Sequence, residues 1–245
     1  MYRFKIAKIQ EDFFTLAGEE RHHLLNVLRL QPGEKIIGFD NSGRQWQGVI
    51  EAITKEAVEC RIYAEELPQV EARTKVYLVM GLAKGEKMEW VIQKGTELGM
   101  AGFIPLRTER AVVRLEGPKA LERVSRWQKI AAEAVKQSRR VVEPVVSPIA
   151  DWQDLTKALP PETQWLLPYE DEKTFSLSNT LQEFKPEYSI AILIGPEGGF
   201  TPHEVAKARE NLKARSVSLG PRILRTETAA LAALVMVLAH FADLG

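Results

Sequence analysis

Cysteine, a leader-like apolar segment and an excess of positive charge are scarce or missing in this 245-residue sequence. Cys60 is the only cysteine, which excludes a disulfide framework and a cysteine-based zinc site. Lysine and arginine together number 33, and so do aspartate and glutamate, so the chain has no global basic signature for nucleic acid. Any nucleic-acid binding must therefore come from local patches.

The sequence also has no hydrophobic stretch of membrane-spanning length. The N-terminal segment MYRFKIAKIQ carries charges throughout and has no apolar core of signal-peptide length. The longest apolar run, Ala229–Ala239, is too short to cross a bilayer. With 45% hydrophobic and 27% charged residues, the composition is that of a soluble globular protein. We expect a cytoplasmic protein with no membrane partner and no bound metal.

Two regions with different patterns flank the polar stretch EELPQVEARTK at residues 65–75. Residues 1–70 contain strand-like runs, such as EKIIGFD, QWQGVIEAI and AVECRIYAEEL, and one helix at EERHHLLNVLRL. This pattern predicts a small β-barrel with an inserted helix. In residues 75–245, apolar runs such as VYLVMGLA, GFIPL, QWLLPY and IAILIG alternate with helical stretches. We predict an α/β domain with a mostly parallel sheet covered by helices on both faces.

The stretch ILIGPEGGFTPHEV, residues 192–205, predicts a strand, a glycine-rich turn and a helix. Thr201, Pro202 and Glu204 fit the N-cap, N1 and N3 positions of a capping box, so the helix begins just after the glycines. The turn matches neither the G-x-G-x-x-G fingerprint nor a P-loop, and Glu197 within it would repel a phosphate. A ligand with a positive centre suits the turn better. The equal alternative is that Glu197 merely caps the following helix.

A second glycine-bearing loop lies in SVSLGPRILRTETAALAALVMVLAHF, residues 216–241. A short strand and a Gly-Pro break precede a helix that is apolar on nearly every side, which is typical of a helix buried in the core or in a subunit interface. Ligands bind outside the carboxyl ends of strands in open α/β sheets, so the two loops predict one shared site. An ion pair between Arg225 and Glu227 at the helix start is the structural alternative. Before the helix the sequence concentrates Arg222, Arg225, Thr226, Glu227 and Thr228.

IGPEGGFTPHE and LGPRILRTETAALAAL together resemble the signature of the bacterial ribosomal small-subunit methyltransferase E family, in the SPOUT superfamily of trefoil-knotted methyltransferases. WVIQKGTELGMAGFIPLRTERAV and EAVKQSRRVVEPVV are similar to the family's intermediate blocks, and HHLLNVLRLQPGE to its N-terminal PUA-like RNA-binding barrel. The resemblance covers nearly the whole chain. It implies an α/β domain whose C-terminal segment forms a knot, with S-adenosylmethionine as cofactor. The implied reaction is methylation of N3 of one uridine in 16S ribosomal RNA, in the small subunit, by a homodimer.

The chemistry of this implied reaction suggests roles for two residues. The Arg225 guanidinium would stabilise an ionised uracil, and the Glu197 carboxylate would favour the positive sulfonium of the cofactor. The target base must be unpaired or extruded, because N3 lies on its Watson–Crick edge. The implied cofactor-binding residues are Leu167, Pro168, Ile194, Gly195, Glu197, Gly198, Gly199, Leu219, Gly220, Ile223, Leu224 and Arg225. The implied RNA-binding residues are Arg29, Arg110, Arg126, Lys129 and Arg140.

Basic residues recur along a predicted helix in the middle of the chain. At a period of 3.6 residues, four of them fall within an arc of about 80°: Arg126, Lys129, Lys136 and Arg140. The opposite side of the helix carries Leu121, Val124, Ala131 and Val135. A solvated face is the simpler interpretation of such a stripe, whereas the resemblance favours a stripe that contacts phosphates.

Two positions depart from the family pattern, and two other function classes remain open. Arg139 stands where the family usually has a glycine, and Ala111 stands where a serine often occurs. A non-catalytic RNA-binding or ribosome-associated module would keep the basic stripe and lose affinity for the cofactor. A Rossmann-type nucleotide enzyme is disfavoured, because no glycine fingerprint follows an early strand and opens a helix. Binding of S-adenosylmethionine separates the first two classes.

Overall fold

The computed structural model describes residues 1–185 and 187–244, which form two compact units. The first unit consists of Met1–Glu71 together with Val135–Glu143. The second consists of Ala72–Ala134 and the chain after Glu143. Within the described residues, no helix is long and apolar enough to cross a membrane.

The first unit is built on a six-stranded sheet with the strand order β1-β4-β5-β6-β3-β2. β1 pairs in parallel with β4, and the other neighbours are antiparallel. β1 and β2 lie at opposite edges of the sheet, yet only Ile6 and Ala7 separate them in sequence. The sheet must therefore curl until its two edges meet, as in a barrel. The strands are β1 (Tyr2–Lys5), β2 (Lys8–Gln10), β3 (Phe13–Ala17), β4 (Lys35–Phe39), β5 (Gln45–Ile53) and β6 (Ala57–Glu66).

A short helical segment interrupts this barrel where the sequence predicts a helix. α1 (Gly18–His22) runs directly into a π-helical turn, η1 (His23–Val27), so the helix ends earlier than the pattern EERHHLLNVLRL suggests. Leu24 is the residue of this segment that is fully buried in the barrel core, beside Phe4 and Phe14. The segment therefore packs on the barrel core through Leu24 and, at a partly buried position, through Leu25.

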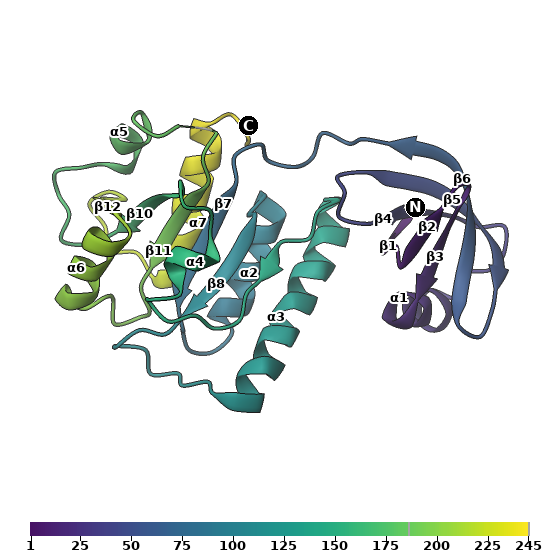
Figure 1. The fold of residues 1–245 in the computed structure, drawn as a ribbon, viewed down its shortest axis with the longest axis horizontal. Coiled ribbons are helices and arrows are strands. Elements are labelled where there is room, and N and C mark those ends of the chain that lie inside the picture. Colours follow the sequence, from purple (N-terminus) through teal and green to yellow (C-terminus); the bar gives the residue numbers. More distant parts are fainter. Residues whose placement is uncertain (186, 245) are drawn as a thin grey trace. The chain divides into compact units, whose positions relative to one another are not determined.

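The second unit is an α/β domain with an all-parallel sheet in the order β12-β10-β11-β7-β8-β9 (Figure 1). Each sequence-predicted apolar run after residue 75 forms one of these strands. The strands are β7 (Val76–Gly81), β8 (Gly102–Leu106), β9 (Val145–Val146), β10 (Gln164–Pro168), β11 (Ile190–Ile194) and β12 (Arg215–Val217). The helices are α2 (Lys87–Leu98), α3 (Gly117–Ser138), α4 (Leu155–Ala158), α5 (Leu177–Leu181), α6 (Pro202–Asn211) and α7 (Thr226–His240). The last turn of α3, from Val135 on, belongs to the first unit.

Helices cover both faces of this sheet because successive strand residues point to opposite sides. In β11, Ile190, Ile192 and Ile194 join the core under α2, α3, α5 and α7, whereas Ala191 and Leu193 join the core under α4 and α6. Figure 1 shows α7, in yellow, lying along β7 and β11. The buried parallel arrangement brings the carboxyl ends of β7, β10 and β11 to one edge.

The start of α6 confirms the capping box that the sequence predicts. The Thr201 hydroxyl accepts a hydrogen bond from the Glu204 N–H at 3.2 Å, and the Glu204 carboxylate accepts one from the Thr201 N–H at 2.9 Å. Pro202 occupies N1, where its missing N–H is not needed. The helix axis therefore begins directly after the glycine-rich turn.

The basic stripe predicted along α3 does not continue to Arg140. α3 ends at Ser138, and Arg139 has a φ of +62°, in the left-handed region that favours glycine at helix ends. The resemblance implies a glycine at this position, and the left-handed conformation favours one. Arg140 then turns inward and is only 4% exposed. Its placement on an exposed helical face, as expected from the sequence, is wrong.

Arg140 instead pairs with Glu71, which fixes Val135–Glu143 to the first unit. Glu71 Oε2 accepts hydrogen bonds from Arg140 Nε at 3.0 Å and Nη2 at 2.7 Å. Its Oε1 accepts from the N–H groups of Val141 and Val142. Burial raises the pKa of the Glu71 carboxyl, but the bonds and charge of Arg140 and the two backbone N–H groups outweigh this and hold its pKa below its usual value.

We expect Glu71→Gln to lower the free energy of unfolding by about 1–3 kcal/mol at pH 7, because it removes a charge-assisted bond to a buried guanidinium. A carboxyl group whose pKa is lower in the folded protein than in the unfolded chain stabilises the fold at pH values above the unfolded-state pKa. This stabilisation is lost as the pH falls through the folded-state pKa. The difference between parent and variant should therefore shrink below about pH 4. Urea unfolding at several pH values measures it, with Glu65→Gln as a control, since Glu65 pairs with Arg44 at the surface. Equal stabilities at pH 7 would contradict this role.

Candidate functional site

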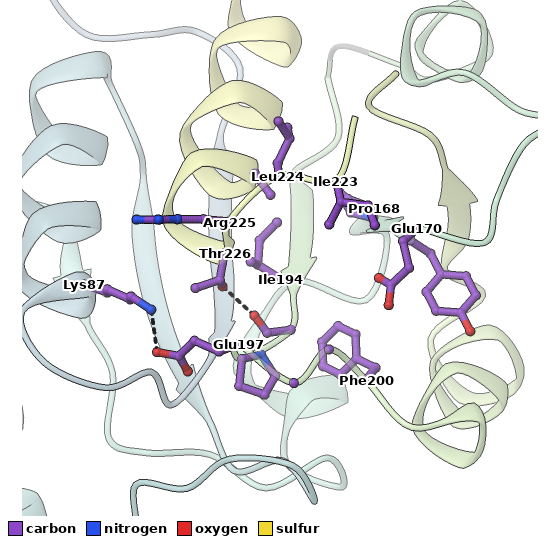
Figure 2. Close-up of a pocket in the computed structure, with 16 residues that line it drawn as sticks. Lys87, Pro168, Glu170, Ile194, Glu197, Phe200, Ile223, Leu224, Arg225 and Thr226 are labelled. Atoms are coloured by element: carbon purple, nitrogen blue, oxygen red, sulfur yellow. Dashed lines mark hydrogen bonds and ion pairs between the residues drawn. The ribbon is translucent and has the colours of Figure 1, made fainter. Parts of the chain in front are cut away.

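A pocket of about 510 Å³ opens where the chain leaves β10 and β11 (Figure 2). We call this pocket the turn lobe, because the glycine-rich turn after β11 forms much of its wall. A second pocket of about 120 Å³, here called the loop lobe, is lined by the loop from Ser218 to Leu224. The lobes are two parts of one cavity, because they share Pro168, Tyr169, Glu170, Ile223, Leu224 and Ala229.

The structure brings the two sequence-predicted loops together around this cavity. Every predicted cofactor-binding residue except Leu167 lines one of the lobes. Leu167 is fully buried in the sheet, in the core under α4 and α6. Several lining residues were not singled out from the sequence: Lys87, Tyr169, Glu170, Phe200 and Ala229. The position of Tyr169 and Glu170 directly after β10 is a signal that would have identified them.

The glycine-rich turn packs against the end of β7 with no room for a side chain. A Cβ on Gly81 would lie 2.7 Å from Pro196 Cδ and 2.8 Å from Pro196 N. A Cβ on Gly195 would lie 3.1 Å from two backbone atoms of Gly199. Gly199, at a φ of +66°, closes the turn by donating its N–H to the Pro196 carbonyl at 2.9 Å. The turn is therefore tightly folded, which exposes its backbone to the cavity.

Arg110 holds the outer side of this turn. Its Nη1 donates to the carbonyl oxygens of Gly198 at 3.0 Å and Phe200 at 3.3 Å. The Cβ that Gly198 lacks would face Arg110 Cβ at 3.2 Å, so the bare α-carbon makes room for the arginine. The sequence assigned Arg110 to RNA, but its guanidinium contacts the turn backbone in this structure.

The buried carboxylate of Glu204 fixes the chain on both sides of the turn's C-terminal end, through hydrogen bonds to α6 and to a neighbouring loop. Glu204 is only 1% exposed, yet three N–H groups satisfy it. Its Oε1 accepts from the Glu109 N–H at 2.9 Å and from Trp152 Nε1 at 3.2 Å, and its Oε2 caps α6 through Thr201. The same side chain thus joins the start of α6 to the loop that carries Arg110, and a buried charge with this many donors is well stabilised.

Of the two sequence interpretations of Glu197, the structure contradicts helix capping, and the stabilisation of a cationic ligand stays a prediction. Glu197 does not cap α6, since Thr201 and Glu204 do so. Its Oε1 accepts from the Lys84 N–H at 2.9 Å and from Lys87 Nζ at 2.7 Å (Figure 2). Burial raises the pKa of its carboxyl, but the Lys87 bond and backbone N–H groups outweigh this and keep its pKa below the usual value. Glu197 is therefore ionised, and an adjacent ammonium neutralises much of its charge.

The loop before α7 is tied to the glycine-rich turn by one hydroxyl. Thr226, the first residue of α7, donates from Oγ1 to the Gly195 carbonyl at 2.5 Å. Arg225, one residue earlier, is exposed and lines the turn lobe. In the part of the chain that the structure describes, its guanidinium has no ion pair with Glu227 and no hydrogen-bond partner. Figure 2 shows Arg225 extending toward the side of the pocket where Lys87 lies.

The remaining RNA candidates fall into two groups. Arg29 is exposed beside the barrel, at a φ of +56°. Arg126 and Lys129 are exposed on α3, where Arg126 Nη2 lies 2.9 Å from Glu89. Arg140 is buried against Glu71, as described above, and Lys136 pairs with Glu20 at 2.7 Å. The structure leaves Arg126 and Lys129 as the exposed cations of the predicted stripe.

Two family models match the chain. Residues 70–238 match an RNA methyltransferase domain, and residues 16–63 match an RNA methyltransferase PUA domain. The chain is 38% identical to ribosomal RNA small subunit methyltransferase E of Bacillus subtilis over 225 residues, which cover 90% of this chain and 88% of that protein. It is 34% identical to the Synechocystis protein of the same description, over 96% of this chain and 77% of that one.

Solved structures agree with these matches. The Neisseria gonorrhoeae ribosomal RNA small subunit methyltransferase E, described as bound to S-adenosyl methionine, has a TM-score of 0.83 and 33% identity. The alignment covers 96% of this chain and 95% of that chain. A Legionella pneumophila structure, described as a putative methyltransferase in complex with the cofactor SAM, has a TM-score of 0.82 and 30% identity, with 97% and 96% covered. The predicted α/β domain with an N-terminal PUA-like domain is thereby confirmed, and the chain belongs to the ribosomal RNA small subunit methyltransferase E family.

Proposed function

We propose that this enzyme uses S-adenosylmethionine to methylate N3 of a uridine in 16S ribosomal RNA. The observation that carries the proposal is the two-lobed cavity, which is lined by exposed backbone of the glycine-rich turn and by the loop before α7. Relatives of matching length are described as small-subunit ribosomal RNA methyltransferases, and one is described as bound to this cofactor. The choice of N3 and of uridine is the further step that the chemistry below supports.

The cavity fits the chemical groups of the proposed cofactor. Leu219, Ile223 and Leu224 give the loop lobe apolar walls, and Gly220 leaves an open space of at least 4 Å where a side chain would project. These features suit a flat adenine ring that needs apolar contact and backbone hydrogen bonds. The turn lobe, next to the ionised Glu197, suits the polar methionine half. S-adenosylmethionine would supply an activated methyl group there.

Arg225 is the residue we assign to the charge that develops on uracil. Loss of the N3 proton leaves a negative charge on the base, and a guanidinium aimed at it lowers the barrier. The other cation of the turn lobe, Lys87, is already paired with Glu197. Arg225 has no carboxylate partner among the described residues, so its charge is available to the target base. Thr226 anchors the adjacent backbone to Gly195, which holds Arg225 at the rim.

Arg225→Ala should slow methyl transfer by about 10²–10³, roughly 3–4 kcal/mol, because the charge it stabilises exists mainly in the transition state. Affinity for cofactor and RNA should stay near that of the parent. Arg225→Lys should recover part of the rate, since an ammonium keeps the charge but loses the planar fork. Single-turnover methylation at saturating RNA and cofactor measures these rates. Arg215→Ala, an exposed arginine outside the cavity, is the control, and parental turnover of Arg225→Ala would remove Arg225 from the mechanism.

Arg110→Ala should weaken binding of S-adenosylmethionine by about tenfold, because two carbonyl groups of the turn lose a charged hydrogen-bond donor and the turn loosens. Arg114→Ala is a matched control, since Arg114 is an exposed arginine on the same loop. Isothermal titration compares the two variants. A large loss of RNA affinity with unchanged cofactor affinity would instead support the RNA contact that the sequence suggested.

We also assign Arg126 and Lys129 to RNA phosphates. Replacing both with Gln should weaken RNA binding and lower the slope of log K against log salt concentration by about 1–2, because fewer counterions are released. Cofactor affinity should not change. The control pair Lys213→Gln and Arg215→Gln removes the same charge elsewhere on the second unit. An unchanged slope for the α3 variant would identify its exposed face as merely solvated.

The remaining parts of the proposal concern assembly. We propose a cytoplasmic homodimer in which α7 contributes to the subunit interface, because its partly exposed side also consists of apolar residues. These residues include Leu231, Ala232, Val235 and Met236. The trefoil knot implied by the resemblance stays a prediction, and the tie between Thr226 and Gly195 is the contact that would hold its two loops together.

A further inference from the structure

Glu170 lies at the junction of the two lobes, at a position that the sequence did not single out. It follows β10 by two residues and lines both the turn lobe and the loop lobe. Figure 2 shows its carboxylate on the side of the pocket away from Lys87 and Arg225, near Pro168 and Phe200. A group bound against Glu170 would therefore occupy the middle of the cavity and lie apart from the cations at the opposite rim.

The carboxylate of Glu170 lies close to the backbone of Gly199. The Cβ that Gly199 lacks would lie 3.2 Å from Glu170 Oε1 and 3.8 Å from Oε2. A side chain at Gly199 would crowd these oxygens, and its φ of +66° disfavours one for a separate reason. The glycine thus keeps the face of the carboxylate open toward the cavity.

Three carboxylates surround the turn, and Glu170 is the one for which neither oxygen accepts a hydrogen bond from a described residue. Glu197 is engaged by Lys84 and Lys87, and Glu204 is saturated by three N–H groups. Glu170 is exposed and has no hydrogen-bond donor or ion-pair partner within residues 1–185 and 187–244. Its two oxygens can accept two neighbouring hydrogen bonds from a ligand.

We propose, on the basis of the function proposed above, that Glu170 binds the ribose hydroxyls of the cofactor. The ribose joins the adenine to the methionine half, so it must cross the junction where Glu170 lies when these two halves occupy the loop lobe and the turn lobe. A vicinal diol presents two donors at the spacing of one carboxylate, as in nucleotide sites where an acidic residue holds a ribose. The sulfonium, in contrast, must face the target base near Arg225.

The test compares ligands that share the ribose and differ in charge. Glu170→Ala should bind S-adenosylmethionine and S-adenosylhomocysteine about tenfold or more weakly than the parent, with equal losses, because both ligands carry the same diol. The 2′-deoxy and 3′-deoxy analogues of S-adenosylhomocysteine should bind the parent more weakly than S-adenosylhomocysteine does. At least one of these analogues should bind Glu170→Ala as tightly as it binds the parent. Isothermal titration gives all these constants, and Glu210→Ala, an exposed glutamate on α6 outside both lobes, should bind like the parent.

The outcomes separate this inference from the proposed function. The ribose contact alone would be overturned if Glu170→Ala bound the natural ligands as tightly as the parent does. It would also be overturned if the substitution weakened the binding of both deoxy analogues as much as it weakens the binding of S-adenosylhomocysteine. A loss confined to S-adenosylmethionine would show that Glu170 senses the sulfonium charge and would also overturn it. A parent protein that binds neither natural ligand would overturn the proposed function and this inference with it. Melting of each variant without ligand shows whether the fold is intact, which we expect because Glu170 is exposed.

Discussion

The close packing of Pro196 on Gly81 is the contact on which the rest of the site depends. A methyl group at Gly81 would lie 2.7 Å from the proline ring, so the turn after β11 rests directly on the end of β7. Protein interiors tolerate such misfits poorly, because the surrounding structure cannot shift cheaply. The other side of the turn faces the cavity, so further groups must hold its backbone in place there. Arg110 binds its outer carbonyls, and Glu204 fixes the helix that follows.

The charged side chains around this turn suit two species of the proposed reaction. One is a ligand with a positive charge, and the other is a base that becomes negative when it loses a proton. Lys87 neutralises Glu197, and backbone N–H groups enclose Glu204, so these carboxylates serve mainly to position the backbone. Glu170 and Arg225 keep their charges open toward the cavity from different sides (Figure 2). Opposite charges at separated points of one pocket allow a bound ligand to be oriented as well as attracted.

The sequence predicts the parts of this structure that depend on local pattern. The limits of β5 match the run QWQGVIEAI, and the capping box at Thr201 and Glu204 forms as the motif indicates. Local pattern fails where a partner comes from a distant segment. Glu197 is bound by Lys84 and Lys87, more than 100 residues earlier in the chain, so its neutralisation has no signal within the turn.

Arg140 shows a second limit of sequence pattern. A helical period places it on the same face as Arg126, but the period applies only while the helix continues. The left-handed conformation of Arg139 ends the helix, and Glu71 then draws Arg140 into the barrel unit. The departure of Arg139 from a usual glycine was visible in the sequence, and a glycine at that place is itself a sign of a helix end.

The most direct test of the account is mass spectrometry of 16S ribosomal RNA from a strain that lacks this gene, complemented with the parent or with Arg225→Ala. The account predicts that one uridine loses an N3 methyl group in the deletion strain, that the parent restores it, and that the variant restores little of it. A methyl group on another base or another atom, or a 16S ribosomal RNA that is unchanged by the deletion, would contradict the central claim.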